Sequence, residues 1–373
     1  MKMTKTNQDM DVDYEIMIVG GGPAGISTWL HLNKYNPDLA SKCVLIEKEK
    51  YPRDKVCGGA LGGWTETLLE QLKFKANVPS VSIHTAEVRL GKDIYEHKQH
   101  NFFRIVRRIE FDHALAKTAV NRGLTLNENE IFTDVLRKTN YVSIKTNRRQ
   151  YKVRVLIGAD GALSRVRHKM NSLKKPRLTP AIEIFSPADQ NYDLEFFKNT
   201  VTIDFSPVTE GLQGYVWHFP CLYENQPFMN HGIGDFRIYH NKQRADLKKI
   251  FTRELQARNI HINLKYWSGH PITVLEEDCI ISEPNILLVG DAAGIDSAIG
   301  GGIHLALSYG DVAALSIVEA FENNDFSFND YTMRFQNHLV GKYIRKLNYL
   351  AREMYADNTK ILSTIHEIFS KRK

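Results

Sequence analysis

Three glycines near the start of the chain have the spacing of a dinucleotide-binding turn. Gly20, Gly22 and Gly25 form a G-x-G-x-x-G pattern, and Glu47 follows 22 residues after Gly25. Gly20 permits a tight turn, Gly22 lets backbone N–H groups approach a pyrophosphate, and Gly25 lets a helix pack closely on a strand. Glu47 can accept a hydrogen bond from a ribose hydroxyl. The pattern therefore predicts a dinucleotide site.

The residues around these glycines predict the elements that such a site requires. The segment "YEIMIVGGGPAGISTWLHL" is typical of a short apolar strand, a glycine turn and a helix with Pro23 in its first turn. A second strand is expected in "CVLIEKE", with Glu47 near its end. The N-terminus of the helix would then face the phosphates of the ligand.

A second group of residues is aromatic. Tyr215, Trp217 and Phe219 alternate in "GYVWHFP", which ends at Pro220. In a strand, side chains two residues apart point to the same face, so the three rings would lie together. Such a face is either part of a packed core or one wall of a pocket, and this segment alone leaves both interpretations open.

The wider pattern predicts an α/β (α+β) fold with a Rossmann-like nucleotide-binding domain. Parallel-sheet character returns in "VRVLIGADG" and in "NILLVGDAAG", and the residues between them alternate short strands and turns. We expect the nucleotide-binding domain to comprise residues 12–77, 105–175 and 284–335. An inserted, mostly antiparallel β-sheet substrate domain would comprise 78–104 and 176–283, and a C-terminal helical segment 336–373.

The C-terminal segment has the pattern of an amphipathic helix. Apolar residues recur at helical spacing, and basic residues lie between them. The apolar positions are Val340, Tyr343, Ile344, Leu347, Leu350, Ala351 and Met354, and the basic ones are Lys342, Arg345, Lys346 and Arg352. The helix either docks on the body of the protein or presents a basic surface to anionic lipid.

Composition narrows the class of protein. The 373 residues are 43% hydrophobic and 25% charged, as in an ordinary globular chain. The four dispersed cysteines form no C-x-x-C pair, which argues against a disulfide framework or zinc site and favours a reducing, cytoplasmic compartment. No metal is predicted. The N-terminus lacks the apolar core of a secretory signal, and no uninterrupted apolar run approaches the roughly 20 residues of a membrane span. A net charge of +6, mostly scattered, argues against nucleic-acid binding.

Several segments resemble known flavoproteins. "VLIGADGALSRVR" and "ILLVGDAAGIDSAIGGGIHLALSYGDVAA" are similar to the D-G and G-D segments of the flavoprotein hydroxylase (p-hydroxybenzoate hydroxylase-like) superfamily, and "RIEFDHAL" resembles a helix start of the same superfamily. This resemblance implies that the dinucleotide is FAD. "PRDKVCGGAL" and the Y-x-W-x-F-P pattern from Tyr215 to Pro220 resemble the geranylgeranyl reductase family within it. That resemblance implies that the aromatic strand is a wall of the substrate cavity facing the flavin.

The resemblance also implies roles for individual residues. Asp291 would contact the ribityl and pyrophosphate portion of FAD, Arg108 the ribityl chain, and Asp160 the pyrophosphate region. The helix beginning near Gly301 would direct its N-terminal dipole at the flavin pyrimidine ring. The full expected FAD-binding set is Gly20, Gly22, Pro23, Ala24, Gly25, Glu47, Lys48, Lys55, Cys57, Gly58, Arg108, Asp160, Gly161, Gly290, Asp291, Gly301, Gly302 and Ile303.

Cys57, Tyr215, Trp217 and Phe219 are the residues expected to act in catalysis. Gly58 and Gly59 would let Cys57 approach the flavin, although a buried cysteine is often an inert apolar residue. Simpler alternatives exist for Asp291 as a helix cap and for Arg108 as a surface ion pair.

The resemblance implies an FAD-dependent oxidoreductase that reduces carbon–carbon double bonds of an isoprenoid or other apolar substrate by hydride transfer from reduced flavin. Tyr215 and Trp217 would stabilise cationic character on carbon through their ring faces. The transient reductant would be NAD(P)H or a reduced ferredoxin-like donor. Peripheral contact with the membrane and the oligomeric state stay open.

The main alternative is an FAD-dependent monooxygenase or halogenase of a tailoring pathway. The halogenase pattern W-x-W-x-I-P differs from this chain at Tyr215 and Phe219, and hydroxylases usually have a proline where this chain has Ala298. Many reductases also have that proline, so Ala298 leaves the local geometry near the flavin open. A flavoprotein–quinone electron carrier would need iron–sulfur ligands that the dispersed cysteines do not supply.

Overall fold

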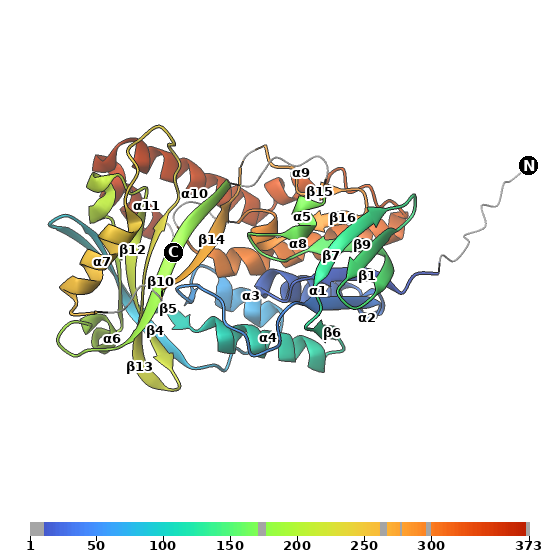
Figure 1. Ribbon diagram of the computed structural model, residues 1–373, viewed down its shortest axis with the longest axis horizontal. Coiled ribbons are helices and arrows are strands. Elements are labelled where there is room, and N and C mark those ends of the chain that lie inside the picture. The colour runs from blue at the N-terminus through green and yellow to red at the C-terminus, as the bar shows by residue number, and fades with distance from the viewer. Residues whose placement is uncertain (1–10, 171–176, 262–266, 277, 296–299, 371–373) are drawn as a thin grey trace, which may run out of the picture.

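The computed structural model of the chain describes residues 11–170, 177–261, 267–276, 278–295 and 300–370. Two β-sheets lie at opposite ends of an elongated molecule, and long helices run along them (Figure 1). The boundary expected between residues 175 and 176, and Ala298, lie outside the described residues. The predicted α/β architecture, with a Rossmann-like sheet, a second sheet and C-terminal helices, is confirmed.

The first sheet contains the predicted nucleotide-binding strands. Its main path runs β15-β16-β9-β1-β2-β6, and β7 and β8 extend it beside β9. The strands are β1 (Tyr14–Val19), β2 (Cys43–Glu47), β6 (Thr125–Glu128), β7 (Phe132–Arg137), β8 (Val142–Thr146), β9 (Gln150–Gly158), β15 (Ser282–Glu283) and β16 (Ile286–Leu288). Strand β1 pairs in parallel with β2 and β9, placing Ile18 opposite Leu45 and Ile157. All three side chains are buried, as expected for a parallel sheet covered on both faces.

Helices α1 (Pro23–Tyr35) and α8 (Gly302–Asn323) pack on each other beside this sheet (Figure 1). Ser27 Oγ donates to the Leu307 carbonyl at 2.6 Å, and a Cβ atom at Gly310 would lie 2.5 Å from Ser27. Close packing therefore depends on a small residue at each position. The shorter helices are α2 (Pro37–Ser41), α3 (Thr65–Gln71), α5 (Arg165–His168), α6 (Leu194–Lys198) and α7 (Leu247–Ala257), with 3₁₀ turns η1 (Ser206–Glu210), η3 (Gly290–Ala292) and η4 (Asn358–Lys360).

Helix α4 (Arg108–Asn121) begins at the segment "RIEFDHAL", which resembles a helix start. The segment "NFFRIVRRIEF" is strand-like, but β5 ends at Val106 and the helix starts two residues later. Phe111 and Leu115 are both fully buried and lie four residues apart, so a helix brings both to the core. The tertiary packing of these residues therefore overrides the local strand preference.

The second sheet is mostly antiparallel and runs β14-β10-β13-β12-β11-β4-β5-β3. Its strands are β3 (Ala60–Leu61), β4 (Ser80–Leu90), β5 (Asp93–Val106), β10 (Arg177–Pro187), β11 (Thr200–Asp204), β12 (Gly214–Tyr223), β13 (Gln226–Asp235) and β14 (Ser268–Val274). The aromatic segment lies in β12, between β11 and β13. It is therefore an interior strand with neighbours on both sides.

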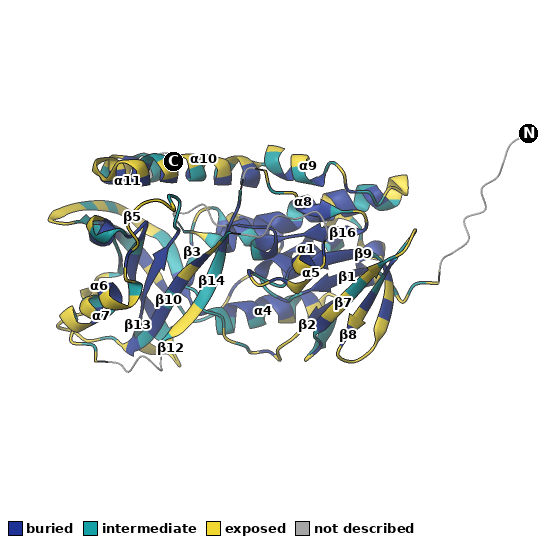
Figure 2. Ribbon diagram, turned by 45° about the horizontal axis from the view of Figure 1, so that its top comes forward, coloured by how far each residue is buried: buried dark blue, intermediate teal, exposed yellow. Residues whose placement is uncertain are grey.

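The C-terminal part forms helices α9 (Tyr331–Asn337), α10 (Leu339–Ala356) and α11 (Ile361–Ser370). The predicted amphipathic pattern is confirmed in α10, where Val340, Ile344, Leu347, Leu350, Ala351 and Met354 are buried and Lys342, Arg345, Lys346 and Arg352 are exposed. Figure 2 shows buried residues on the inner side of this helix and exposed residues along its outer side. The helix docks on the body through its apolar side.

Among the described residues, α8 alone has the length and mean hydropathy of a membrane-spanning helix. Within this protein, 72% of its apolar window is buried, and the helix packs against α1. These features are typical of a core helix. Asp311 and Glu319 interrupt its apolar sequence.

Candidate functional site

A cavity of about 970 Å³ lies between the two sheets and collects nearly all the predicted site residues. Of the expected binding and catalytic residues, Gly25 and Gly290 are the two that do not line it. Both lie behind the wall: a Cβ atom at Gly25 would overlap the Gly20 carbonyl, and one at Gly290 would lie 2.6 Å from Ala24 Cβ. Their small size lets neighbouring segments approach closely. The volume is sufficient for an extended ligand.

The glycine turn leaves open space at the N-terminus of α1. Gly20 has φ +107°, which favours glycine, and a Cβ atom there would overlap the Ala159 carbonyl. At Gly22, by contrast, a Cβ atom would have no neighbour within 4 Å. Gly22 is also the N-cap of α1 and supplies no side-chain cap to its N–H groups. The open space at Gly22 and the first N–H groups of α1 together form a cradle that fits a phosphate group, because a phosphate needs both the space and the donors.

Glu47 holds this turn from the end of β2. Its carboxylate accepts from Gly21 N–H at 2.8 Å and Glu49 N–H at 3.1 Å, and it lies 3.3 Å from Arg53 Nε. It is buried and lines the cavity. Because a carboxylate oxygen can accept more than one hydrogen bond, Glu47 also retains capacity for a ribose hydroxyl.

Two buried arginines share the carboxylate of Asp112. Arg108 donates to it from Nε at 2.6 Å and Nη2 at 2.8 Å, and Arg53 Nη1 lies 3.1 Å from Oδ2. Burial lowers the pKa of Arg108, but Asp112 and Cys57 more than offset this effect, so the net pKa is raised and the residue stays charged. Arg108 is therefore a buried cavity residue and not a surface ion pair. No sequence pattern singled out Arg53.

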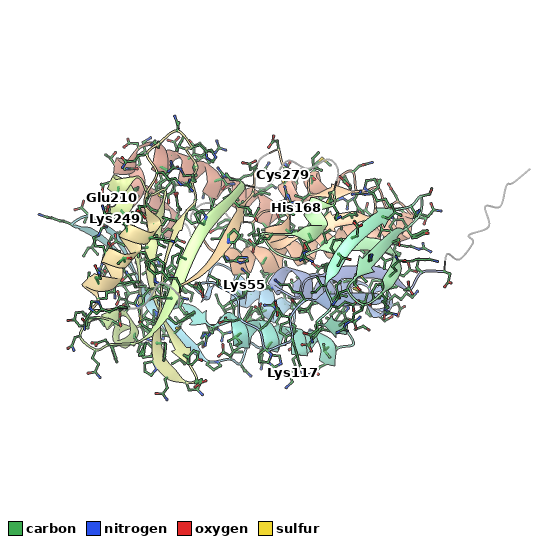
Figure 3. All side chains as sticks on the ribbon, viewed as in Figure 1. Lys55, Lys117, His168, Glu210, Lys249 and Cys279 are labelled. Carbon is green, nitrogen blue, oxygen red and sulfur yellow. The ribbon has the colours of Figure 1, made fainter. Side chains whose placement is uncertain are left out.

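Lys55, labelled near the centre of the molecule in Figure 3, and Asp291 both line the cavity and influence each other's pKa. Burial lowers the pKa of Lys55 to about 8, Asp291 opposes this change, and Arg108 adds to it. Burial also raises the pKa of Asp291, while Lys55 and Arg108 lower it. Asp291 lies in η3 and lines the cavity, and the N-cap of α8 is Gly301 instead. The helix-cap alternative for Asp291 is therefore wrong for α8.

Asp160 organises the loop after β9. Its carboxylate accepts from Ser164 Oγ at 2.5 Å, Arg165 N–H at 2.7 Å and Val166 N–H at 3.2 Å. The next residue, Gly161, has φ +80° and open space at the position of a Cβ atom. Both residues line the cavity, and Asp160 fixes the loop that carries them. A direct contact between Asp160 and a pyrophosphate stays a prediction.

The N-terminus of α8 also borders the cavity. Gly301, with φ +97°, is its N-cap and supplies no side-chain cap, while Gly302 and Ile303 line the cavity beside it. The first N–H groups of the helix therefore carry partial positive charge at the cavity wall.

The aromatic rings of β12 face the cavity. Tyr215, Trp217 and Phe219 all line it, and the latter two are each 9% exposed. Trp217 pairs across the sheet with Gly232, where a Cβ atom would overlap the indole ring. Its Nε1 donates to Asn230 Oδ1 at 2.6 Å. The segment is therefore both a packed strand and a wall of the cavity.

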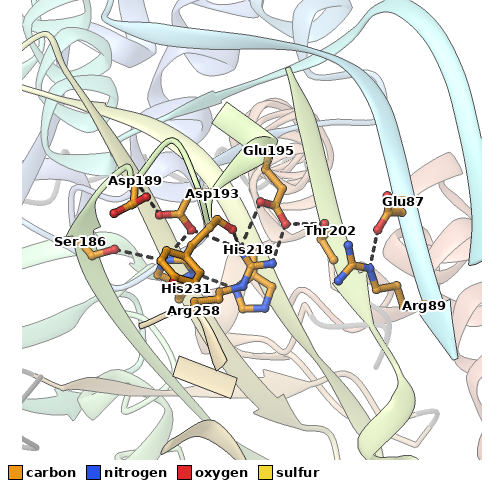
Figure 4. Close-up of polar contacts among 11 residues, drawn as sticks. Glu87, Arg89, Ser186, Asp189, Asp193, Glu195, Thr202, His218, His231 and Arg258 are labelled. Carbon is orange, nitrogen blue, oxygen red and sulfur yellow. Dashed lines mark hydrogen bonds and ion pairs between the residues drawn. The ribbon is translucent and has the colours of Figure 1, made fainter. Parts of the chain in front are cut away.

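The opposite face of β12 carries a separate polar cluster (Figure 4). His218 Nδ1 lies 2.7 Å from His231 Nδ1, and Arg258 contacts Asp193 at 3.2 Å and Glu195 at 2.6 Å. Burial lowers the pKa of both histidines, so they are neutral at pH 7. The cluster ties β12 and β13 to α6 and the end of α7, behind the cavity wall.

The loop that carries Cys57 lies against the aromatic wall. Cys57 N–H donates to Glu183 at 3.1 Å, and Cys57 Sγ accepts from Gly59 N–H at 3.5 Å. A Cβ atom at Gly58 would lie 3.0 Å from the ring of Phe219. Cys57 and Gly58 both line the cavity, so the structure brings the predicted C-G-G loop and the predicted aromatic strand together.

Sequence inspection missed three polar residues of the second sheet: Glu183, Asn230 and His270. Glu183 and His270 line the cavity, and Asn230 lies beneath Trp217. Within the described residues, His270 Nε2 is buried without a hydrogen-bond partner. Burial, followed by Lys55, Lys48 and Arg108, lowers the pKa of His270 to about 4. For Glu183, one sequence signal was available: it is a carboxylate in the otherwise apolar run "AIEIF", and charged residues are seldom buried in a strand without a partner.

Comparison with known proteins identifies the dinucleotide. The model of the FAD binding domain family matches residues 13–181, which span the first sheet from β1 to β9 and reach into β10. This match supports FAD as the cofactor of this chain. The open cradle, the two uncapped helix N-termini and the buried cations suit its pyrophosphate and flavin.

The relatives of this chain include reductases and a chlorinase. Digeranylgeranylglycerophospholipid reductase 2 of Methanosphaera stadtmanae is 25% identical over 96% of this chain and 92% of its own. A 1H-pyrrole-2-carbonyl peptidyl-carrier-protein chlorinase of Pseudomonas fluorescens is 24% identical over 86% of this chain and 79% of its own. The crystal structure of a geranylgeranyl bacteriochlorophyll reductase-like protein of Thermoplasma acidophilum superimposes with a TM-score of 0.69 at 24% identity, covering 96% and 97% of the two chains.

Proposed function

We propose, from the premise that this chain is an FAD-dependent oxidoreductase of the geranylgeranyl reductase-like type, that it reduces carbon–carbon double bonds of an isoprenoid or similarly long apolar substrate. The observation that carries the proposal is the row Tyr215, Trp217 and Phe219, which faces the same cavity as the FAD cradle. The segments 12–77, 105–175 and 284–335 would bind FAD, 78–104 and 176–283 would form the substrate domain, and 336–373 would cover them.

When bound and reduced, FAD supplies the hydride that a double bond takes up. The residues of this chain hold and orient it. Gly22 and the N-terminus of α1 bind the pyrophosphate, Glu47 binds the ribose, and Arg108 with Lys55 places positive charge in the cavity. The uncapped N-terminus of α8 stabilises negative charge on the flavin pyrimidine ring.

The aromatic wall binds the apolar chain and excludes water from it. An unactivated alkene has no carbonyl group to take up charge, so positive character develops on carbon as the reaction proceeds. The ring faces of Tyr215 and Trp217 can stabilise such a charge. The Trp217 N–H is already satisfied by Asn230, so the indole presents its apolar surface to the substrate.

The electron donor belongs to the same proposal. The sequence has one G-x-G-x-x-G turn, already assigned to FAD, and no second one. NAD(P)H or a reduced ferredoxin-like protein would therefore bind transiently. Reduction of the bound flavin by either donor would support this assignment.

A second candidate is an oxygen-dependent monooxygenase or halogenase. The similarity to the chlorinase favours it. Tyr215 and Phe219 argue against a halogenase, because the resemblance to that group requires tryptophan and isoleucine at these positions. The reductase is therefore the preferred function.

We also propose a peripheral contact with anionic lipid for a cytoplasmic protein. Four basic side chains, Lys342, Arg345, Lys346 and Arg352, lie on the exposed side of α10. Leu339 and Tyr349 are 77% and 63% exposed on the same helix. Basic and apolar groups on one helical face suit a lipid surface, from which an isoprenoid substrate would enter.

Product analysis tests the proposed function. The purified protein is incubated without oxygen with a chemical reductant and a geranylgeranyl compound, and the product mass is measured. A product heavier by two hydrogens per reduced bond supports the reductase. Unchanged prenyl compound without oxygen, together with an oxygenated or halogenated product in its presence, favours the second candidate.

A further inference from the structure

Glu183 places a buried carboxyl group on the cavity wall, in β10, which β13 separates from the aromatic strand β12. The residue is 2% exposed, yet it lines the cavity. Its Oε1 accepts from Cys57 N–H at 3.1 Å, and its Oε2 accepts from Asn230 Nδ2 at 3.1 Å. Among the described residues, both hydrogen-bond partners of Glu183 are donors. A proton on this carboxyl group would therefore find its acceptor in the cavity.

Trp217 fixes the direction of these hydrogen bonds. Its indole N–H can only donate, so the Asn230 oxygen must face it at 2.6 Å. The amide NH₂ group of Asn230 then points to Glu183 and to the Cys57 carbonyl, 3.5 Å away. Glu183 thus cannot donate its proton to Asn230, and the assignment does not depend on a choice of amide orientation.

Burial favours a proton on Glu183 near neutral pH. The pKa of Glu183 is raised to about 7, chiefly by burial and to a smaller extent by Asp54, although Asn230, the Cys57 N–H and Lys55 lower it. Asp54 and Lys55 lie on the Cys57 loop, Asn230 is on β13, and β14 contributes Ser268 opposite Glu183. The carboxyl group can therefore both carry and release a proton at the pH of a cell.

We propose that Glu183 is the acid that protonates the second carbon of the double bond. This inference rests on the proposed reductase function. One carbon receives a hydride, with its electron pair, from reduced FAD; the π electrons form the new bond between the other carbon and the Glu183 proton. The O–H bond of Glu183 breaks, its electron pair stays on the carboxylate, and a proton from water restores the acid.

A spectroscopic titration tests whether Glu183 carries this proton. Infrared spectra of the purified protein between pH 5 and 9 should show the carbonyl band of a protonated carboxyl group, which disappears with a midpoint near pH 7 and is missing in Glu183→Gln. Glu319→Gln, which changes a carboxylate on the surface paired with Arg334, should keep the band. A Glu183→Gln spectrum identical to wild type at every pH would overturn the proposal.

Single-turnover kinetics test whether the proton is used. With pre-reduced enzyme and a prenyl substrate, Glu183→Gln should oxidise its flavin at least about 100-fold more slowly, and Glu183→Asp should recover part of the rate. Reduction of the flavin by a chemical reductant should be unchanged, which separates lost protonation from misfolding. If the wild type is active and Glu183→Gln oxidises its flavin equally fast with the same pH profile, the role of Glu183 is overturned and the proposed function is not affected. A wild type that saturates no prenyl bond would overturn the proposed function and this role with it.

Discussion

The indole ring of Trp217 occupies the space above Gly232 on the neighbouring strand, where a Cβ atom would overlap it. The ring can lie over Gly232 because residue 232 has no side chain. Its N–H reaches Asn230, which in turn bonds Glu183. The aromatic wall and the Cys57 loop are therefore held by one connected set of contacts.

Adding a methyl group at Gly232 should displace Trp217 and lower activity. Gly232→Ala should destabilise the protein by about 1–3 kcal/mol and slow prenyl reduction at least about tenfold, because the ring must leave its position. Gly234→Ala is the matched control, since its nearest neighbours would lie 3.9 Å away. Thermal unfolding and turnover of both variants check this, and equal behaviour of the two would contradict it.

A methyl group at Gly22 should affect FAD binding but not folding. The space beside Gly22 is open in the protein, and its φ of −72° suits any residue. We therefore expect Gly22→Ala without FAD to unfold within about 0.5 kcal/mol of the wild type. Its FAD content after purification should fall sharply, because the methyl group enters the phosphate cradle. Stoichiometric FAD in the variant would show that the pyrophosphate binds elsewhere.

FAD binding should weaken as the pH rises through about 8. The lowered pKa of Lys55 means that its positive charge is lost above that value. The dissociation constant of FAD should then rise roughly tenfold between pH 7 and 9 in the wild type, about 1.4 kcal/mol, and change less in Lys55→Met. Fluorescence titration measures both proteins. If the pH profile is the same in both proteins, the charge of Lys55 does not contribute to FAD binding.

The lowered pKa of Lys55 also affects how the free energy of unfolding depends on pH. Folded protein binds fewer protons than unfolded protein between pH 8 and the ordinary Lys pKa of 10.5. The free energy of unfolding in the absence of FAD should therefore gain a positive contribution from Lys55 as pH rises through this window. Lys55→Met should lack that contribution, which denaturant unfolding at several pH values can measure.

If α10 contacts anionic lipid, binding to vesicles should depend on the positive charges of this helix. Reversing two cations in Lys342→Glu/Lys346→Glu should reduce binding to phosphatidylglycerol vesicles by at least about tenfold, given roughly 1 kcal/mol per basic residue. Lys117→Glu changes an exposed residue of α4, on the opposite side of the view from α10 (Figures 1 and 3), and should bind nearly as the wild type does. Vesicle co-sedimentation at low and high salt checks the charge dependence. Unchanged binding of the double variant would exclude α10 as the contact.

Much of the FAD cradle was predictable because local backbone geometry dictates it. The positive φ of Gly20, the open space at Gly22 and the position of Glu47 all follow from a strand, a turn and a helix that are adjacent in sequence. The period-two pattern of β12 similarly placed Tyr215 and Trp217 on one face.

The missed residues depend on contacts between distant segments. Arg53 can be recognised as a site residue only from its contact with Asp112, which lies 59 residues away in the sequence. Glu183 is adjacent to Cys57 and Asn230 only because β10, β13 and a loop from the other end of the chain meet at the cavity. The strand-like pattern of "NFFRIVRRIEF" also continues past the end of β5 at Val106, because the burial of Phe111 in α4 is decided by packing.

The central claim is that this enzyme delivers reducing equivalents to an alkene. The most direct test reduces the bound FAD without oxygen and follows its visible spectrum after addition of a geranylgeranyl compound. The flavin should reoxidise in step with formation of the saturated product, and more slowly in Gly232→Ala. A flavin that stays reduced with every prenyl substrate, but reoxidises in oxygen with an oxygenated or halogenated product, would contradict it.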